Sequence, residues 1–321
     1  MTGGYESTLT QKREKSNGYK HSILTDLSSI KFFGFHKFNI PPLPKKSHSH
    51  AMVLTNDNEI LICGKSHWQD RKEFCNSKKK YVIRDEKVPG RKCLKLEKDK
   101  WVHHSTLNFE REDFTAITMP NGIYLYGGSS SKTLQGEFLE NGSTKWELGP
   151  SLDPFWSSIH GRISGLRITN DEFVLIGVGQ RKEFVMKYNI KQKVWENVMT
   201  LKIPRYAHTC ALINNKIVIS GGIGYSGGAP FHKRPAKTEL IYVQSWTSRI
   251  LEDKKVYQKD SCEEQCGFVT FKDQERLVSF GWKCKIWNDL KEEWEFVEPE
   301  LRLNRSECGI LSLPSTMLIS C

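Results

Sequence analysis

Cysteine and histidine side chains are the residues of this chain best suited to metal chemistry. Cys63 and His67 are separated by three residues, Cys75 follows them, and the pair His48 and His50 precedes them. A structural zinc site needs four ligands at ordered spacings, usually as two close pairs. The Cys-x3-His spacing has no clear second pair, so the sequence predicts no metal and no cofactor.

Thiol and acid–base chemistry finds no better support in the sequence. Neither a phosphate-binding loop nor a paired carboxylate motif nominates an acid–base couple, and we therefore predict a protein that is not an enzyme. The nine cysteines are an odd number, so at least one thiol stays free or pairs between chains. Cys75 and Cys93 could close one insertion, and Cys262 lies close to Cys266, but spacing does not decide the pairing.

The positive charge of the chain is concentrated in one sector. The formal net charge is +11, and residues 1–100 hold 21 Lys and Arg against 11 Asp and Glu, whereas residues 101–321 hold 27 against 26. Much of the excess lies between Lys65 and Lys100, including the run 78–80. No aromatic residues alternate with these lysines as they do in nucleic-acid-binding motifs. The charge therefore indicates a solvated loop, and we predict no nucleic-acid binding.

The bulk composition indicates a soluble protein with a large core. The chain has 321 residues, 38% of them hydrophobic, with nine Trp and sixteen Phe. No run of about 18 apolar residues could span a bilayer, so we predict no membrane partner. The N-terminus lacks the apolar region of a secretory signal, which predicts a cytoplasmic protein by default; an extracellular location would require a signal upstream of Met1.

One sequence pattern recurs along the chain, and the strands that it predicts must position any functional side chain. The stretch "IPRYAHTCALINNKIVISGGIGY" predicts a hairpin with an Asn214-Asn215 turn, followed by an apolar strand that ends in a glycine doublet. "EREDFTAITMPNGIYLYGGSS" repeats the order, and weaker copies also carry a distal Trp. The first glycine of each doublet, or of its remnant, is Gly3, Gly64, Gly127, Gly177, Gly221 and Gly281. The intervals between these glycines are 61, 63, 50, 44 and 60 residues.

This unit resembles the kelch repeat, which runs from an Arg after a Pro to an apolar strand ending in Gly-Gly, with Tyr and Trp in the outer strands. The matching residues are Pro204, Arg205, Gly221, Gly222, Tyr242 and Trp246 in one unit, Gly127, Gly128 and Trp146 in another, and Tyr188 and Trp195 in a third. The resemblance implies an all-β protein, a six-bladed kelch-type β-propeller in a single domain of residues 1–321. Its blades are expected at 44–108, 109–152, 153–203, 204–256 and 257–303.

The sixth blade is expected to be the closing blade, built from both termini. Residues 304–321 would supply its inner strands and residues 1–43 its outer strands, because "MLISC" stops where a glycine doublet should follow and "MTGGY" begins with one. Such a blade would remove the two exposed strand edges of an open fan. Trp101, Trp146, Trp195 and Trp294 are expected to pack between neighbouring blades.

The resemblance also implies where a partner binds. In kelch propellers, ligands commonly meet the loops that enter the inner strand and the loops that leave the glycine doublet. We therefore expect a protein-protein interaction module that binds a protein or peptide partner on this loop face; its oligomeric state stays open. The candidate partner-binding residues are His48, His50, Trp68, Arg111, Asp113, Arg181, Arg205, Tyr206, His208, Tyr225, Trp282 and Arg305.

Two alternatives follow from the same resemblance. Some kelch-like propellers, such as galactose oxidase, are enzymes with a copper centre built from Tyr, His and a Tyr-Cys crosslink, although no motif here places such residues together. Many kelch proteins carry a BTB domain that recruits a ubiquitin ligase, but the repeats here begin by residue 3. The chain would be the substrate-recognition part of such an adaptor only if it is a fragment.

Overall fold

The structure is a computed structural model in which the described part of the chain is all β. Within that part the chain forms strands and turns and no helix, which confirms the predicted all-β class. It therefore contains no helix long and apolar enough to cross a bilayer. The described residues are 5–6, 41, 51–64, 67–75, 80–88, 90–128, 134–153, 163–224, 234–235, 237–251, 267–271, 276–280, 284–296 and 305–306.

Five four-stranded antiparallel sheets follow one another along the described chain, and each takes its strands in chain order. The first sheet consists of β2 (Ala51–Leu54), β3 (Ile60–Cys63), β6 (Gly90–Glu97) and β7 (Lys100–Arg111). The second consists of β8 (Phe114–Met119), β9 (Gly122–Gly127), β10 (Gln135–Glu140) and β11 (Glu147–Ser151). The third consists of β12 (Ser164–Arg167), β13 (Glu172–Val178), β14 (Phe184–Asn189) and β15 (Val194–Thr200).

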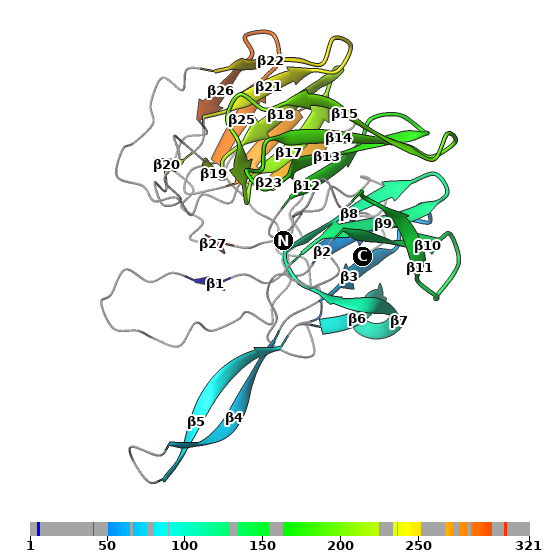
Figure 1. The fold of residues 1–321 in the computed structure, drawn as a ribbon, viewed down its shortest axis with the longest axis vertical. Helices are drawn as coiled ribbons and strands as arrows, with labels where there is room; N and C mark the ends of the chain where they lie inside the picture. Colours follow the sequence, from blue (N-terminus) through cyan, green and yellow to red (C-terminus); the bar gives the residue numbers. More distant parts are fainter. Residues whose placement is uncertain are drawn as a thin grey trace.

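The last two sheets repeat this arrangement. The fourth consists of β17 (Thr209–Ile213), β18 (Lys216–Ser220), β21 (Glu239–Tyr242) and β22 (Thr247–Ile250). The fifth consists of β23 (Gly267–Phe271), β24 (Arg276–Phe280), β25 (Cys284–Asn288) and β26 (Glu293–Phe296). The first strands β2, β8, β12, β17 and β23 are each an edge strand of their own sheet, and consecutive first strands lie side by side (Figure 1).

Short-range sequence signals explain the hairpins inside each sheet. β17 and β18 pair with Ile213 opposite Lys216, which leaves Asn214 and Asn215 as the two-residue turn. Both asparagines have positive φ, 45° and 58°, as a type I′ turn requires, so the predicted Asn-Asn hairpin is confirmed. The second strand of each of the first four sheets is an apolar run because both of its faces are covered; all six residues of β9 are buried.

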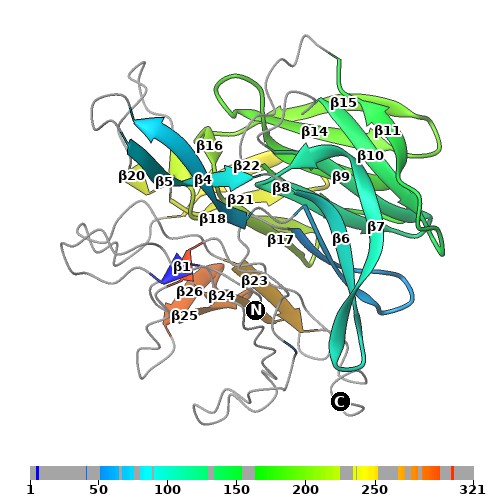
Figure 2. The same ribbon diagram turned by 90° about the horizontal axis from the view of Figure 1, so that it is seen from below.

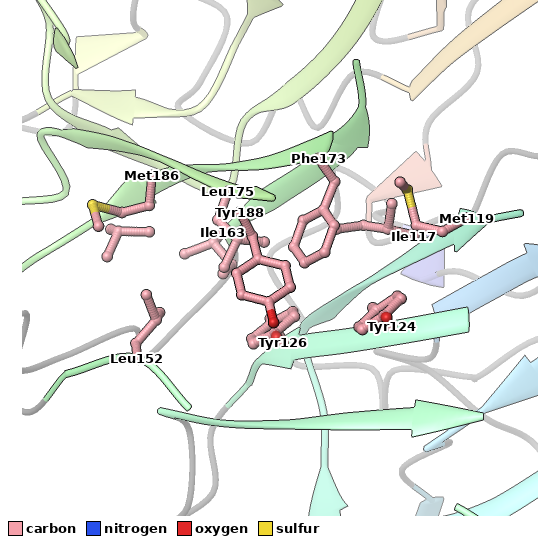
Figure 3. Close-up of a cluster of buried hydrophobic side chains, with 11 residues drawn as sticks. Ile117, Met119, Tyr124, Tyr126, Leu152, Ile163, Phe173, Leu175, Met186 and Tyr188 are labelled. Atoms are coloured by element: carbon pink, nitrogen blue, oxygen red, sulfur yellow. The ribbon is translucent and has the colours of Figure 1, made fainter. Parts of the chain in front are cut away.

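Hydrophobic clusters fill the spaces between consecutive sheets. One cluster joins the second and third sheets, and Figure 3 shows Ile117, Tyr124 and Tyr126 facing Phe173 and Tyr188. Similar clusters join the first sheet to the second, the third to the fourth and the fourth to the fifth. The sheets therefore stack face to face, and each of the three middle sheets contributes one face to each of two neighbouring clusters.

Three of the four tryptophans lie between sheets as expected. Trp146 belongs to the cluster of the first two sheets, Trp195 packs on that of the second and third, and Trp294 on that of the fourth and fifth. Trp101 instead packs with residues of the first sheet alone, on Ile60 and its neighbours. Its Nε1 donates a hydrogen bond to the carbonyl oxygen of residue 41, at 2.9 Å.

The insertion in the first sheet is a β-ribbon, where the sequence indicated a loop. β4 (His67–Cys75) and β5 (Lys80–Val88) pair over nine positions as a separate two-stranded sheet. Figure 1 shows this ribbon extending away from the four-stranded sheets, and Figure 2 shows it from another side. Cys93 is disulfide-bonded to Cys63, its register partner across β3 and β6, so the disulfide closes the base of the insertion.

Two small sheets involve the segments around the glycine doublets. β16 (Arg205–Tyr206) pairs with β19 (Ile223–Gly224), and β19 pairs with β20 (Arg234–Pro235). β1 (Tyr5–Glu6) and β27 (Arg305–Ser306) pair with each other in antiparallel fashion, so segments near the two ends of the chain lie side by side.

Candidate partner-binding loops

A buried arginine stands where the chain enters the second sheet. Arg111 is fully buried, and its Nε lies 2.8 Å from Oε1 of Glu137 on β10. Its Nη1 donates to the carbonyl oxygen of Gly127, the first glycine of the doublet, at 2.7 Å. The other carboxylate oxygen of Glu137 accepts a hydrogen bond from the Asn108 backbone N–H at 2.6 Å. One ion pair thus ties the entering loop to the ends of the second and third strands.

Arg205 has the same role at the entrance to the fourth sheet. It is fully buried, and its Nη2 lies 3.3 Å from Oε2 of Glu239 on β21. Its Nη1 donates to the carbonyl oxygens of Gly221, again the first glycine of a doublet, and of Lys237, at 3.3 and 2.7 Å. Glu239 in turn accepts a hydrogen bond from the Lys202 backbone N–H at 2.8 Å. The two units therefore share one arrangement, in which a buried arginine is bonded to a glutamate and to the first glycine of the doublet.

This burial decides what Arg111 and Arg205 can do. Each guanidinium is enclosed, and each is bonded to a carboxylate and to backbone carbonyl oxygens. A side chain with no exposed surface offers no area to a partner, and a buried ion pair is kept only where its hydrogen bonds are well satisfied. We therefore assign both arginines to the support of the loops and leave them out of the contact surface.

An aromatic ring follows each buried arginine by three residues and covers a glycine of the preceding sheet. A Cβ atom on Gly64 would lie 2.4 Å from a ring atom of Phe114, and one on Gly177 would lie 2.8 Å from Cε1 of His208. Both glycines have positive φ, 65° and 84°, so the position requires glycine for the backbone and for the space. Phe114 and His208 thus fill equivalent positions at the boundary between two neighbouring sheets, and we call each such boundary a seam.

His208 is the polar member of this pair of rings. Its exposed fraction is 7%, and neither ring nitrogen has a hydrogen-bond partner among the described residues. Burial, and to a smaller extent the nearby Arg205 cation, lower the pKa of His208 to about 3. The imidazole is therefore neutral at physiological pH and lies in the seam rather than on the surface.

The loop between β13 and β14 of the third sheet is joined to the loop that enters the fourth sheet. The Arg205 backbone N–H donates to the Lys182 carbonyl oxygen at 3.1 Å. The Lys182 side chain is buried, and this burial lowers its pKa to about 8, an effect that the Glu183 carboxylate partly offsets. Arg181, next to Lys182, is exposed, and Tyr206, next to Arg205, is half-buried. Four predicted residues thus belong to this seam: Arg205 and His208 are buried, and Arg181 and Tyr206 keep exposed surface.

The remaining predicted residues do not gather at this seam. Asp113 is half-buried beside Arg111, with a positive φ of 57°. Trp68 lies in the ribbon, paired with Lys87, and Arg305 pairs with Glu6 in the small sheet of the chain ends. Outside the described residues lie His48, His50, Tyr225 and Trp282.

Metal and thiol chemistry has little to build on in the described part of the chain. No group of three His, Cys, Asp or Glu side chains lies there as metal ligands would. Cys210 is a free cysteine, but burial raises the pKa of its thiol to about 12, against a smaller lowering by Ser164. A thiol with such a pKa stays protonated and is a poor nucleophile at neutral pH.

One further motif falls at the edge of the described residues. Residues 224–228 read Gly-Tyr-Ser-Gly-Gly and match the Gly-x-Ser-x-Gly spacing of serine hydrolases. That motif needs a strand before the serine and a helix after it. Strand β19 ends at Gly224, and the serine lies outside the described residues, so we assign it no role.

The supporting residues Glu137, Glu239 and Lys182 were not among the predicted functional residues. Both glutamates stand on the third strand of their sheet, opposite the residue two positions before the first glycine of the doublet. Glu137 lies 10 residues after Gly127 and Glu239 lies 18 residues after Gly221, so an alignment of the two units on their doublets does not reveal this shared acidic position. Lys182 carries no signal in the sequence either.

No protein-family model matches this chain, and no curated protein sequence matches it. Its function is therefore argued from the geometry of the loops alone.

Proposed function

We propose that this chain is a six-bladed kelch-type β-propeller that binds a protein or peptide partner through the loops at one end of its sheets. The observation that carries this proposal is the joined pair of loops between the third and fourth sheets. There the Arg205 backbone N–H donates to the Lys182 carbonyl oxygen, and the Arg205 side chain forms a buried ion pair with Glu239. These contacts support the neighbouring residues Arg181 and Tyr206, which we call the rim.

The pairing of the chain ends supports a closing blade built from both termini. In the fourth unit Arg205 is opposite Gly224 and Tyr206 is opposite Ile223, the two residues that follow the glycine doublet. Arg305 is opposite Glu6 and Ser306 is opposite Tyr5, the two residues that follow Gly3 and Gly4. The register is identical. The two residues after the N-terminal doublet thus pair with the unit beginning at Arg305 as the residues after Gly221 and Gly222 pair in the fourth unit.

The outer face of the first sheet supports the same closure. Ile60, Ile62 and Leu94 are buried on that face together with Trp101, in a cluster made of first-sheet residues alone. Trp101 bonds there to the carbonyl oxygen of residue 41, in the segment expected to form the closing blade. A sixth blade would cover this apolar face, which otherwise has no neighbouring sheet in the described part of the chain.

The neighbouring first strands are arranged as the inner strands of a propeller would be. Thr118 Oγ1 donates to the Leu54 carbonyl oxygen at 2.6 Å, which links the first strands of sheets one and two. The Gly165 backbone N–H donates to Thr115 Oγ1 at 3.0 Å, which links those of sheets two and three. These two hydrogen bonds join neighbouring first strands, as contacts between the inner strands of adjacent blades would.

The chemistry of the rim suits a protein partner. Arginine and tyrosine are the side chains most often found among energetically dominant contacts at protein interfaces, because each combines a large flat area with hydrogen-bond donors. Arg181 and Tyr206 are the chain neighbours of Lys182 and Arg205, whose backbones are hydrogen-bonded to each other, and this support lowers the entropic cost of ordering them on binding.

The double variant Arg181→Glu with Tyr206→Ala tests this proposal in partner capture from cells that express the protein. We expect the loss of the specifically captured protein, because reversed charge and lost aromatic area each weaken an interface. Lys191→Glu is the matched control, since Lys191 is exposed in the turn at the opposite end of the third sheet. Equal capture by both variants and the wild type would contradict binding at this rim.

A further inference from the structure

The turn between β10 and β11 carries a motif that neither the fold nor the rim uses. Asn141, Gly142 and Ser143 follow Glu140, the last residue of β10, and read Asn-x-Ser. An Asn-x-Ser or Asn-x-Thr sequence without proline in the middle is the acceptor signal for asparagine-linked glycosylation. Because so short a motif also arises by chance, its structural surroundings must decide whether it can carry a glycan.

The turn leaves open space around the asparagine. Asn141 and Gly142 are both exposed, and so is the nearby Lys145. A Cβ atom placed on Gly142 would meet no atom within 4 Å apart from those of its chain neighbours. A branched sugar chain attached to Asn141 therefore has room in the solvent.

The Asn141 side chain can keep its hydrogen bonds when a sugar is attached. Its Nδ2 donates to the Pro120 carbonyl oxygen at 2.7 Å, and its Oδ1 accepts from Nδ2 of Asn56 at 2.9 Å. An amide nitrogen carries two protons, and the bond to Pro120 uses one of them. Attachment of a sugar replaces one proton and leaves the other, so the folded turn and the glycan are compatible.

The disulfide between Cys63 and Cys93 indicates the compartment that this modification needs. Both side chains are fully buried, at paired positions of β3 and β6. Disulfides form and persist in oxidising compartments such as the secretory lumen and are rare in the cytosol, where thiols are kept reduced. Asparagine-linked glycans are likewise typical of secreted proteins. The disulfide of the first sheet and the motif of the second thus indicate the same route.

Asn141 lies at the end of the second sheet opposite to the loops that Arg111 supports. Arg111 donates to the carbonyl oxygens of Gly127 and Gln135, where β9 ends and β10 begins. Asn141 follows the other end of β10, and its backbone N–H donates to the carbonyl oxygen of Asn121, in the turn between β8 and β9. A glycan on Asn141 therefore leaves the loop end of this sheet free.

We propose that Asn141 carries an asparagine-linked glycan, transferred from a polyprenyl-diphosphate oligosaccharide by the glycosyltransferase of the secretory lumen. In this transfer Nδ2 of Asn141 forms a bond to the anomeric carbon of the oligosaccharide. The bond from that carbon to the diphosphate breaks, polyprenyl diphosphate leaves, and Nδ2 releases one proton. The Ser143 hydroxyl completes the acceptor signal, and Asn141 is the residue that is modified.

Site-resolved mass spectrometry of the full-length protein, purified from the cells that produce it, tests this proposal. Release of the sugar by a peptide N-glycosidase in heavy-oxygen water converts a glycosylated asparagine into a labelled aspartate. We expect the label at residue 141 and a disulfide-linked peptide that joins Cys63 to Cys93 in the same digest. An Asn141 peptide that is unlabelled and unmodified would overturn the proposal.

Two substitutions of one residue are the matched variants, expressed in the same cells. Ser143→Ala removes the hydroxyl of the acceptor signal and keeps Asn141, whereas Ser143→Thr keeps a hydroxyl. We expect Ser143→Ala to lose the label at residue 141 and Ser143→Thr to retain it. Equal labelling of Ser143→Ala and the wild type, or a label at the second Asn-x-Ser sequence, Asn304, alone, would also refute the proposal. Either failure leaves the rim untouched, because neither variant changes Arg181 or Tyr206.

Discussion

His208 occupies the place that Phe114 occupies two sheets earlier. Each ring follows a fully buried arginine by three residues and covers a positive-φ glycine of the preceding sheet. A hydrocarbon ring fills the earlier seam, whereas the later seam holds an imidazole whose two nitrogens have no hydrogen-bond partner in the described part of the chain. The same fold position thus carries a polar group at a cost in stability.

His208→Phe should therefore stabilise the protein. The change removes two unsatisfied buried nitrogens, and we expect the free energy of unfolding in urea to rise by about 1 to 2 kcal/mol. The reciprocal variant Phe114→His should lower it by a similar amount, since it buries an unpartnered imidazole in the earlier seam. A lower unfolding free energy for His208→Phe would contradict the equivalence of the two rings.

The same residue predicts a loss of stability in acid. The folded pKa of His208 is about 3, below its ordinary value of 6.5. As pH falls below 6.5, the unfolded state binds a proton that the folded state does not. The free energy of unfolding should then fall by up to about 1.4 kcal/mol per pH unit until pH 3. Urea unfolding from pH 7 to 4 measures this, and the difference between the wild type and His208→Phe isolates it. A constant difference across that range would contradict a neutral buried imidazole.

The buried Arg–Glu pairs should be essential to the fold. Glu137→Gln removes the charge that faces Arg111 at 2.8 Å, where neither side chain is exposed. Leaving a buried charge uncompensated costs about 3 to 5 kcal/mol of unfolding free energy. Glu172→Gln is the control, because its ion pair with Lys187 is partly exposed and should change the unfolding free energy by about 1 kcal/mol or less. Similar small losses from both variants would refute the supporting role.

The disulfide at the base of the ribbon gives a fourth prediction. Cys63 and Cys93 are 30 residues apart, and closing a loop of that length stabilises the folded state by about 3 to 4 kcal/mol. A reductant should lower the melting temperature of the wild type and leave the Cys63→Ala, Cys93→Ala double variant unchanged. A wild type insensitive to reductant would show that these cysteines are not bonded.

Local signals made much of the fold predictable. Asn214 and Asn215 reveal a turn because few residues adopt positive φ, and the doublet at Gly221 reveals the end of a strand for the same reason. Apolar runs such as that of β9 then identify strands covered on both faces. These features depend on neighbouring residues only, so one sequence suffices to find them.

The support of the candidate site was not predictable in the same way. Arg111 and Arg205 follow polar or proline-containing segments that are typical of exposed loops. Their burial depends on Glu137 and Glu239, which are 26 and 34 residues away along the chain. Only the strand register brings each pair together, and the register is a property of the folded sheet.

The ribbon and its disulfide were missed for a related reason. Charged residues at half of the positions of 67–88 are typical of a solvated loop, and no apolar alternation indicated strands. The pairing of Cys63 with Cys93 follows from the register of β3 and β6, whereas spacing alone left the partner of Cys93 open.

Ring closure by the two ends of the chain is the central claim, because it places the loops of all units on one face. The double variant Tyr5→Cys with Ser306→Cys puts two thiols at paired positions, and mild oxidation followed by mass spectrometry of the proteolysed protein measures their bond. Glu6→Cys with Ser306→Cys is the control, one position out of register and on the opposite face. We predict a crosslink between residues 5 and 306 that raises the melting temperature, and little crosslinking in the control. Equal crosslinking in both variants, or none in either, would contradict the closing blade.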